Sequence, residues 1–353
     1  MHPLGHAAIA GLLLFATPAR TLAAAADPAP EPPLRPEDTP ALPAEPEVVP
    51  APAETAPAPA EAAPAAGDLR PVSNWLEAQV ELHRRGFSCG SIDGVGGPQT
   101  VAALRAFQAS IGLDETGRLD PPTRENLLLT APALTTHTFV PEELVNLQPV
   151  PTTWLEKSEL KSMAYGSALE MIAERCRASP NFLKRLNPDV DLENIWPGTA
   201  IQVPAPGAFK PATKAARLHV RLAEHILEAT DDTGRVIAHF PVSIARSVEK
   251  RPVGELHVTV VIANPDYTFD PEVFPESPEA KELGRKLIIQ PGPNNPVGVA
   301  WIGLDRTGYG IHGTPDPEKV GRTESHGCLR LANWDALTLF QLAWVGLPVT
   351  VEP

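Results

Sequence analysis

Cysteine is scarce in this chain of 353 residues, which contains only Cys89, Cys176 and Cys328. An odd count excludes a framework in which every cysteine has a cysteine partner, so at least one thiol remains even in an oxidising compartment. A bridge between Cys89 and Cys176 would leave Cys328 as that thiol. Separate thiols are equally compatible with the sequence, because it does not show whether two Cα atoms come within bridging distance.

Long apolar runs are also lacking. The most apolar stretch, AAIAGLLLFA at residues 7–16, is too short to span a bilayer, and no later segment is apolar enough to do so. Small residues with A-x-A-type cleavage sites follow near Ala24 to Ala26, which is typical of a secretory signal peptide, although an uncleaved anchor is the alternative. The sequence therefore predicts export to the periplasm or cell wall.

Basic residues are too few to form a positive stripe. The formal net charge is −14, which argues against nucleic acid as a partner. Half of this charge comes from residues 27–66, where eight acidic residues stand against one arginine among prolines and alanines, without glycine or aromatic residues. Such a segment cannot form a packed core. It predicts an extended linker that reaches on the order of 100 Å at ~3.1 Å per residue.

Three short helices are predicted between residues 73 and 130. SNWLEAQVELHRRG has apolar residues at helical spacing and ends at Gly86, Pro98 begins a second helix whose core face includes Ile111, and DPPTRENLLL begins a third. The segments GFSCGSIDGVGGPQTVAALRAFQ and TGRLDPPTRENL resemble the three-helix peptidoglycan-binding module found beside cell-wall enzymes. The resemblance implies an all-α bundle with peptidoglycan as its partner.

A second small unit is predicted between residues 164 and 204. SALEMIAERC and SPNFLKRLNP read as two helices, the second with Ser179 as N-cap, and WPGTAIQVP as a turn into a strand. This α+β unit resembles the lysin motif, which implies glycan binding. Gly166-Ser167 stands where that family has Gly-Asp, and a purely structural spacer is the alternative reading.

From residue 216 onward the sequence is β-rich. RLHVRLAEHILEA, RVIAHFPVSIA, GELHVTVVIA, KLIIQ and GVAWIGL are β-branched and separated by turn signals such as DDTG and PGPNNP. NWDALTLFQLAW then predicts a helix, and residues 348–351 a closing strand. Several short strands at this spacing indicate a β-rich domain with little helix.

The stretch YGIHGTPDPEKVGRTESHGCLRL at residues 309–331 places His312 sixteen positions before Cys328. A cysteine thiol with a pKa near 8.5 is mostly protonated at neutral pH, so it needs a base to act as a nucleophile. We assign His312 as general base and Cys328 as nucleophile. Gly327 permits unusual backbone angles, and the N–H groups of Gly327 and Cys328 are candidate donors to an oxyanion.

The motifs YGIHGT and SHGCLRL, with RPVGELHV and GPNNPVGVAWIGL upstream, resemble the L,D-transpeptidases of peptidoglycan over residues 217–351. The resemblance implies a β-sandwich-like catalytic domain that needs no cofactor or metal. It implies that Cys328 takes an acyl group from a tetrapeptide stem, releases D-Ala and passes the acyl group to an amine acceptor. It also implies that carbapenem-type β-lactams acylate Cys328.

The same resemblance assigns supporting roles around the thiol. The backbone carbonyl of Gly313 orients His312. His326, Ser325 and Gly327 shape the pocket around the thiol. Arg330 is a candidate partner for a substrate carboxylate. Asn295 and Trp301 are candidates for lining the cleft.

Each of these assignments has a plainer alternative. His312 could be a buried core histidine, His326 and Arg330 structural supports, and Ser325 a turn former. Asn-Pro loops and single tryptophans such as Asn295 and Trp301 are commonly turn and core residues. A zinc site from His312, His326 and Cys328 lacks a fourth ligand and the usual spacing.

The sequence leaves three functions open: a transpeptidase, a carboxypeptidase or endopeptidase that hydrolyses the same acyl-enzyme, and a non-catalytic wall-binding protein. The acceptor could be a diamino acid, a free D-amino acid or an anchored protein. The predicted organisation is a signal peptide at 1–26, a linker at 27–70, the peptidoglycan-binding module at 71–131, the lysin-motif-like module at 157–206 and the catalytic domain at 215–353.

Overall fold

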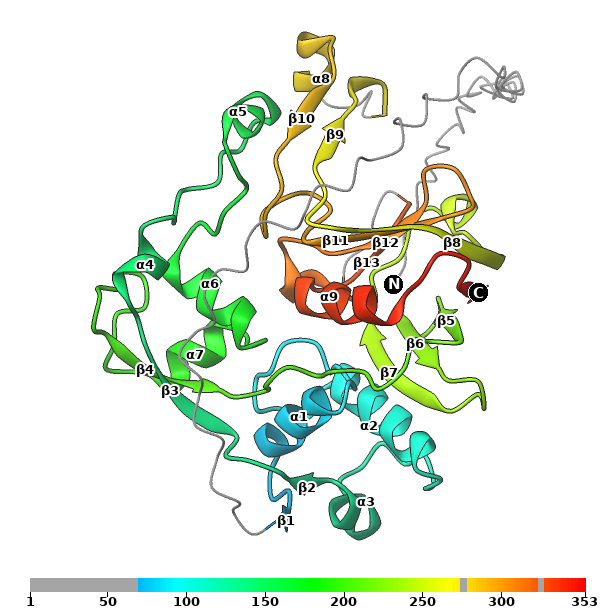
Figure 1. The fold of residues 1–353 in the computed structure, drawn as a ribbon. Coiled ribbons are helices and arrows are strands. Elements are labelled where there is room, and N and C mark those ends of the chain that lie inside the picture. Colours follow the sequence, from blue (N-terminus) through cyan, green and yellow to red (C-terminus); the bar gives the residue numbers. More distant parts are fainter. Residues whose placement is uncertain (1–68, 274–277, 323–326) are drawn as a thin grey trace, which may run out of the picture. The chain divides into compact units, whose positions relative to one another are not determined.

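The computed structural model describes residues 69–273, 278–322 and 327–353 (Figure 1). The predicted signal peptide and nearly all of the predicted linker lie outside these residues. So do Ser325 and His326 of the predicted site.

The first elements form the helical module. Asn74 and Asp120 accept hydrogen bonds from backbone N–H groups three residues ahead and so cap its first and third helices. Ile111 is 42% exposed, contrary to the prediction, because the second helix ends at Ser110 and Ile111 is its C-cap. The elements are β1 (Arg70–Pro71), α1 (Trp75–Arg84), α2 (Pro98–Ser110), α3 (Pro121–Asn126) and β2 (Leu128–Leu129), with β1 antiparallel to β2.

The second group is a β-α-α-β unit. Its outer strands β3 (Leu134–Thr138) and β4 (Ala200–Pro204) are antiparallel, and they enclose α6 (Ala168–Arg175) and α7 (Pro180–Leu186) in sequence. Leu169, Ile172 and Leu183 fill its core. The strand β3 lies before the predicted start of the unit. Two short helices, α4 (Pro141–Leu144) and α5 (Trp154–Glu159), lie between β3 and α6.

The β-rich prediction for the C-terminal part is confirmed. Eight strands form one mixed sheet in the order β13-β12-β11-β8-β14-β5-β6-β7, and the helix α9 (Asn333–Leu342) packs against it (Figure 1). The strands are β5 (Arg217–Arg221), β6 (Ile226–Thr230), β7 (Val236–Pro241), β8 (Gly254–Ala263), β11 (Ala300–Leu304), β12 (Gly310–His312), β13 (Leu329–Arg330) and β14 (Pro348–Glu352), with the 3₁₀ turns η2 (Val248–Lys250) and η4 (Pro317–Lys319).

The sheet curls until its two edges meet. Ser243, just after the edge strand β7, forms an antiparallel bridge with Arg330 of β13, the opposite edge strand. One apolar core therefore collects side chains from both halves of the sheet, including Val220, Phe240 and Ile311, together with Leu339 of α9. This closure accounts for the sandwich-like character that the sequence predicts.

A separate arm extends from the sheet after β8. The strands β9 (Tyr267–Phe269) and β10 (Leu287–Ile289) pair antiparallel, and η3 (Pro271–Val273) and α8 (Pro278–Leu283) lie between them in sequence. Trp154 of α5 stacks on Phe269, with ring centroids 4.4 Å apart. The arm thus shares a small core with the segment that connects β3 to α6.

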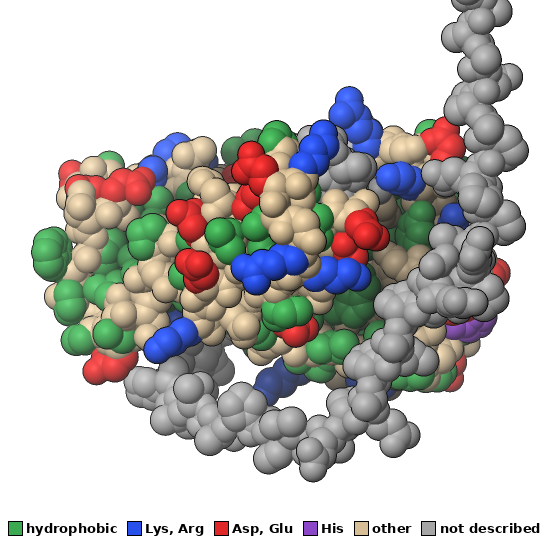
Figure 2. Space-filling view, turned by 90° about the horizontal axis from the view of Figure 1, so that it is seen from above, with side chains coloured by type: hydrophobic (Ala, Val, Ile, Leu, Met, Phe, Trp, Pro, Cys, Tyr) green, Lys and Arg blue, Asp and Glu red, His purple; other side chains and the backbone are tan. Residues whose placement is uncertain are grey.

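Charges are mixed on the face shown in Figure 2, where acidic and basic side chains alternate with apolar ones. The exposed pattern on this face is not the continuous basic stripe typical of nucleic-acid binding. Within the described ranges, no helix combines the length and apolarity needed to cross a membrane.

Candidate active site

His312 ends β12 with its ring almost completely buried. Its Nδ1 lies 2.6 Å from the carbonyl oxygen of Gly313, so Nδ1 carries the proton and donates, because a carbonyl only accepts. Burial lowers the pKa of His312 to about 4, Gly313 opposes this shift, and the positive charge of Arg330 adds to it. The ring is therefore neutral near pH 7, with Nε2 available to take a proton.

Cys328 directly precedes β13, which runs parallel to β12. Ile311 pairs with Leu329 and His312 with Arg330 in this register. Arg330 and His312 pair in register on parallel chains about 4.8 Å apart, so their side chains project from the same face of the sheet. Cys328 lies in the bend two residues before Arg330, and its role as nucleophile, like that of His312 as base, stays a prediction.

Backbone groups contact the sulfur from the β12 side. The thiol donates to the carbonyl of Gly308 at 3.5 Å. Burial raises the pKa of Cys328, while a backbone hydrogen bond from Gly310 and the charge of Arg330 lower it. At rest Cys328 is therefore a neutral thiol and His312 a neutral imidazole, and deprotonation of the thiol would accompany attack on a substrate.

Trp301 lies on the strand next to His312 and pairs with it in register. The two rings stack with centroids 5.6 Å apart at 21°. The indole also covers Gly310, where an added Cβ would lie 2.5 Å from the ring. Trp301 therefore covers one side of the imidazole, and its predicted contact with substrate stays a prediction.

Arg330 and Gly327 flank the thiol on its own chain. Burial lowers the pKa of Arg330, whereas the charges of Asp316 and Cys328 raise it. Ser325 and His326, the other predicted members of this segment, lie outside the described residues. The roles of all four stay predictions.

Asn295 is completely buried in the turn before β11. Its amide donates to the carbonyls of Ile289 and Gln290, and its side-chain oxygen accepts from Val297 N–H. These are the contacts of a turn residue, and substrate contact by this side chain would require the turn to open.

The sequence analysis did not single out Asn333, the first residue of α9. Its Oδ1 accepts from Val299 N–H and lies so close to Gly313 that an added Cβ there would be 2.3 Å away. Its amide donates to Glu174 of α6 at 2.9 Å. Asn333 thus supports the peptide that fixes the tautomer of His312. No local pattern indicated this contact, because its members are far apart in sequence.

Tyr267 of β9 is a second residue that the sequence did not reveal. Burial raises the pKa of its phenol to about 12, and the charges of Cys328 and Asp270 add to the shift. The arm therefore brings a phenol within electrostatic range of the thiol.

All three cysteines are thiols in the structure. Cys89 packs in the core of the helical module, and Cys176 in the core of the β-α-α-β unit. Among the described residues, no three potential metal ligands cluster, and the zinc alternative depends on His326, which lies outside them. A cysteine thiol and an imidazole of fixed tautomer are the groups that nucleophilic acyl transfer requires.

Two family models match the chain. Residues 215–351 match the L,D-transpeptidase catalytic domain, YkuD, and residues 72–127 match the "Putative peptidoglycan binding domain". The chain thus carries an L,D-transpeptidase catalytic domain behind a peptidoglycan-binding domain, as the sequence motifs indicated. The lysin-motif-like unit stays a prediction.

Curated relatives of this chain are also named L,D-transpeptidases. The chain is 28% identical over 188 residues to "Putative L,D-transpeptidase YkuD" of Bacillus licheniformis, covering 53% of this chain and 95% of the relative. It is 36% identical over 118 residues to "Putative L,D-transpeptidase YqjB" of Bacillus subtilis, covering 32% and 57%. A solved structure of L,D-transpeptidase 3 from Mycobacterium tuberculosis with a faropenem-derived adduct is 18% identical, at a TM-score of 0.31, over 45% of this chain and 76% of that one.

Proposed function

We propose that this protein is a cell-wall L,D-transpeptidase in which Cys328 is the nucleophile and His312 the general base. The observation that carries the proposal is the His312–Gly313 hydrogen bond, at the end of the strand that pairs with β13 directly after Cys328. It leaves the Nε2 lone pair as the only proton acceptor of the ring.

In the first half-reaction, sulfur attacks the carbonyl carbon of the L,D-peptide bond in a tetrapeptide stem while His312 Nε2 takes the thiol proton. The N–H groups of Gly327 and Cys328 are our candidates for holding the resulting oxyanion. When the bond to the leaving nitrogen breaks, Nε2 returns the proton to that nitrogen. D-Ala departs, and a thioester remains on Cys328.

In the second half-reaction, an acceptor amine attacks the thioester and gives a proton to Nε2, which then restores the thiol. Arg330 provides a positive charge beside the sulfur and is our candidate partner for a substrate carboxylate. A diamino acid side chain, a free D-amino acid or a lysine of an anchored protein would all supply the amine. Capture by water instead would make the enzyme a carboxypeptidase or endopeptidase.

Incubation with tetrapeptide muropeptides tests this function. Mass spectra should show D-Ala release together with 3→3 cross-linked dimers, and the Cys328→Ala variant should yield neither. Tripeptide without dimer would identify a hydrolase. Intact substrate with correctly folded wild-type protein would favour a non-catalytic wall-binding protein.

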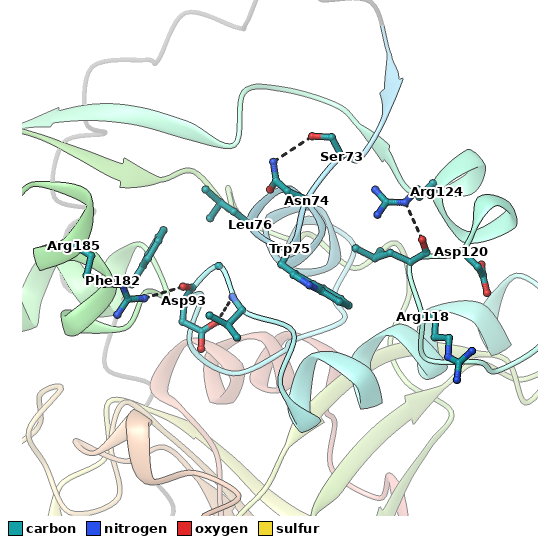
Figure 3. Close-up of a pocket in the computed structure, with 13 residues that line it drawn as sticks. Ser73, Asn74, Trp75, Leu76, Asp93, Arg118, Asp120, Arg124, Phe182 and Arg185 are labelled. Carbon is teal, nitrogen blue, oxygen red and sulfur yellow. Dashed lines mark hydrogen bonds between the residues drawn. The ribbon is translucent and has the colours of Figure 1, made fainter.

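For the helical module we propose that peptidoglycan binds in a cavity of about 1000 Å³ between this module and α7. Figure 3 shows Trp75 in the cavity wall, with Phe182 and Arg185 on one side and Arg118 and Asp120 on the other. Aromatic faces and guanidinium groups suit a ligand that carries sugar rings and carboxylates. The cavity thus gives the lysin-motif-like unit a share in wall binding.

Sacculus pull-down tests this cavity. Arg118→Ala should weaken retention, whereas Arg105→Ala, an exposed arginine of α2 that does not line the cavity, should not. Equal retention of both variants and wild type would remove the cavity from the proposal.

Export and inhibition complete the proposed function. N-terminal sequencing of secreted protein should place cleavage near Ala24 to Ala26. The match of residues 215–351 to the L,D-transpeptidase catalytic domain supports acylation of Cys328 by penem- or carbapenem-type β-lactams. Such an adduct should add the mass of the drug to the wild type and be absent from Cys328→Ala.

A further inference from the structure

Gln99, in the first turn of α2, reaches from the helical module into the catalytic domain. Its side-chain amide donates a 2.8 Å hydrogen bond to the carbonyl of Val320. Val320 is buried and directly follows η4, within the segment that connects His312 to Cys328. One side chain of the wall-binding module therefore holds the backbone of the catalytic loop.

The contact is closely fitted on both sides. An added Cβ at Gly90 would lie 2.3 Å from Gln99 Oε1, and one at Gly321 would lie 2.7 Å from Gln99 Nε2. Both glycines have positive φ, 73° and 69°, which other residues rarely adopt. The carboxamide thus lies between two glycine backbones, one in each domain.

Ser243 transmits this contact to the strand that carries the nucleophile. Its hydroxyl accepts from Gly321 N–H at 2.9 Å and donates to Lys319 O at 3.4 Å. Its own backbone N–H and carbonyl each bond to Arg330 at 2.9 Å. Arg330 lies opposite His312 in the sheet and two residues after Cys328. The chain of contacts therefore runs from Gln99 through Ser243 to both proposed reacting residues.

The helical module is also fixed to the sheet next to this point. Ser88 N–H donates to His239 O, and His239 N–H donates to Gly86 O, so Phe87 extends the sheet beyond β7. The Ser88 hydroxyl donates to the buried carboxyl of Asp335 in α9 at 2.9 Å. Module and sheet belong to one compact unit. These contacts fix the helical module against the sheet, so Gln99 is held in position beside Val320.

We propose that Gln99 is a positioning residue of the catalytic site, so that the helical module completes the active site in cis in addition to binding the wall. The inference rests on the proposed roles of Cys328 and His312. Loss of the Gln99 amide releases Val320 and Gly321, loosens the Ser243–Arg330 bridge and displaces the sulfur from the imidazole. Displacements of this size lower turnover strongly, because attack requires closely set atoms.

The test compares Gln99→Met, which keeps the length but removes the donor, with Gln108→Met as control. Gln108 lies in the same helix and is completely buried. Its amide donates to Thr116, Arg118 and Thr123, and its side-chain oxygen accepts from Gly117 N–H, all within the module. We expect Gln99→Met to lower kcat on tetrapeptide muropeptides roughly three- to thirty-fold with KM nearly unchanged. Gln108→Met should lower the melting temperature and leave kcat at wild-type level below that temperature.

A second variant gives a pH signature that a purely structural role would not produce. Gln99→Glu can donate to Val320 only when its carboxyl is protonated. Its kcat, taken as a ratio to wild type at each pH, should approach one near pH 5 and fall by pH 8. A ratio that does not vary with pH would overturn the proposal.

Alkylation of Cys328 by iodoacetamide, followed by peptide mass spectrometry, separates this proposal from the proposed function. A rate of Cys328 alkylation that differs between Gln99→Met and wild type supports positioning even if no substrate turns over. Cys89 and Cys176, which are buried, serve as internal references. Unchanged alkylation and unchanged kcat would overturn it. So would equal kcat losses in Gln99→Met and Gln108→Met, since these would report general destabilisation of the module.

Discussion

The Nδ1–H group of His312 donates a hydrogen bond to the carbonyl oxygen of Gly313, 2.6 Å from Nδ1. This contact fixes one tautomer of a ring that burial keeps neutral. It thereby determines which nitrogen can accept a proton from the thiol. The proposed mechanism depends on Nε2 being the nitrogen without a proton.

Replacing the base should therefore slow acylation more than it weakens binding. His312→Gln should lower kcat for D-Ala release by ~10²–10⁴-fold, the usual contribution of a positioned general base. His257→Gln is the matched control, because His257 lies on β8 with its side chain largely exposed beside Asp305. Comparable losses in both variants would show that His312 acts through the fold alone.

The thiol should titrate above the ordinary value for cysteine. Burial raises the pKa of Cys328, so its iodoacetamide reaction should increase with pH through a midpoint above about 8.5. A preformed thiolate–imidazolium pair would instead give a plateau of fast alkylation between about pH 5 and 7. Such a plateau would contradict the neutral resting pair.

Asn333 should help to fix the His312 tautomer, because it packs against Gly313, whose carbonyl accepts from His312. Asn333→Ala leaves the Val299 N–H and the Glu174 carboxyl without this partner, at a cost of about 1–3 kcal/mol in unfolding free energy. It should also lower kcat, because the peptide of Gly313 loses its neighbour. Asn187→Ala removes a similarly buried amide from the β-α-α-β unit, which bonds Leu183 and Gln202.

Denaturant unfolding should show comparable destabilisation of the two asparagine variants, and steady-state kinetics should show a kcat loss for Asn333→Ala alone. Loss of kcat in both variants would mean that lowered stability, and not support of Gly313, explains the effect.

The contact between helical module and sheet should weaken as pH rises. Burial raises the pKa of Asp335 to about 7, opposed by its hydrogen bond from Ser88 and the charge of Arg177. The folded protein therefore holds a proton that the unfolded chain releases near pH 4, so stability falls as pH rises from about 4 to 7 and levels off above. His83 and His312, whose pKa values burial lowers, act in the opposite direction, so the test compares variants: Asp335→Asn should gain melting temperature relative to wild type between pH 5 and pH 8.

Asp335→Asn should reduce this pH dependence while keeping the bond from Ser88. Glu174, whose pKa burial likewise raises to about 7, contributes in the same direction. Asp335→Asn combined with Glu174→Gln should therefore reduce the fall of melting temperature with rising pH further. A slope unchanged in the double variant would assign the effect to other groups.

The sequence predicted the strands of the sheet, because strands and turns leave local patterns. The partnership of His312 with Cys328 stays a prediction. The sequence did not predict Gln99, Asn333 or Tyr267. Gln99 contacts a carbonyl 221 positions away, and nothing near it in sequence marks that contact. Ser179 shows a related limit: it occupies the N-cap position of α7, but its hydroxyl donates to Glu318 instead of capping the helix.

The bridge from Phe87 to His239 covers β7, which would otherwise be an edge of the catalytic sheet. An uncovered strand edge is a template on which a second chain can add. A fragment that begins at residue 215 would expose this edge to its own copies. Self-association of such a fragment is therefore the expected result of removing the helical module, and concentration-dependent light scattering would reveal it.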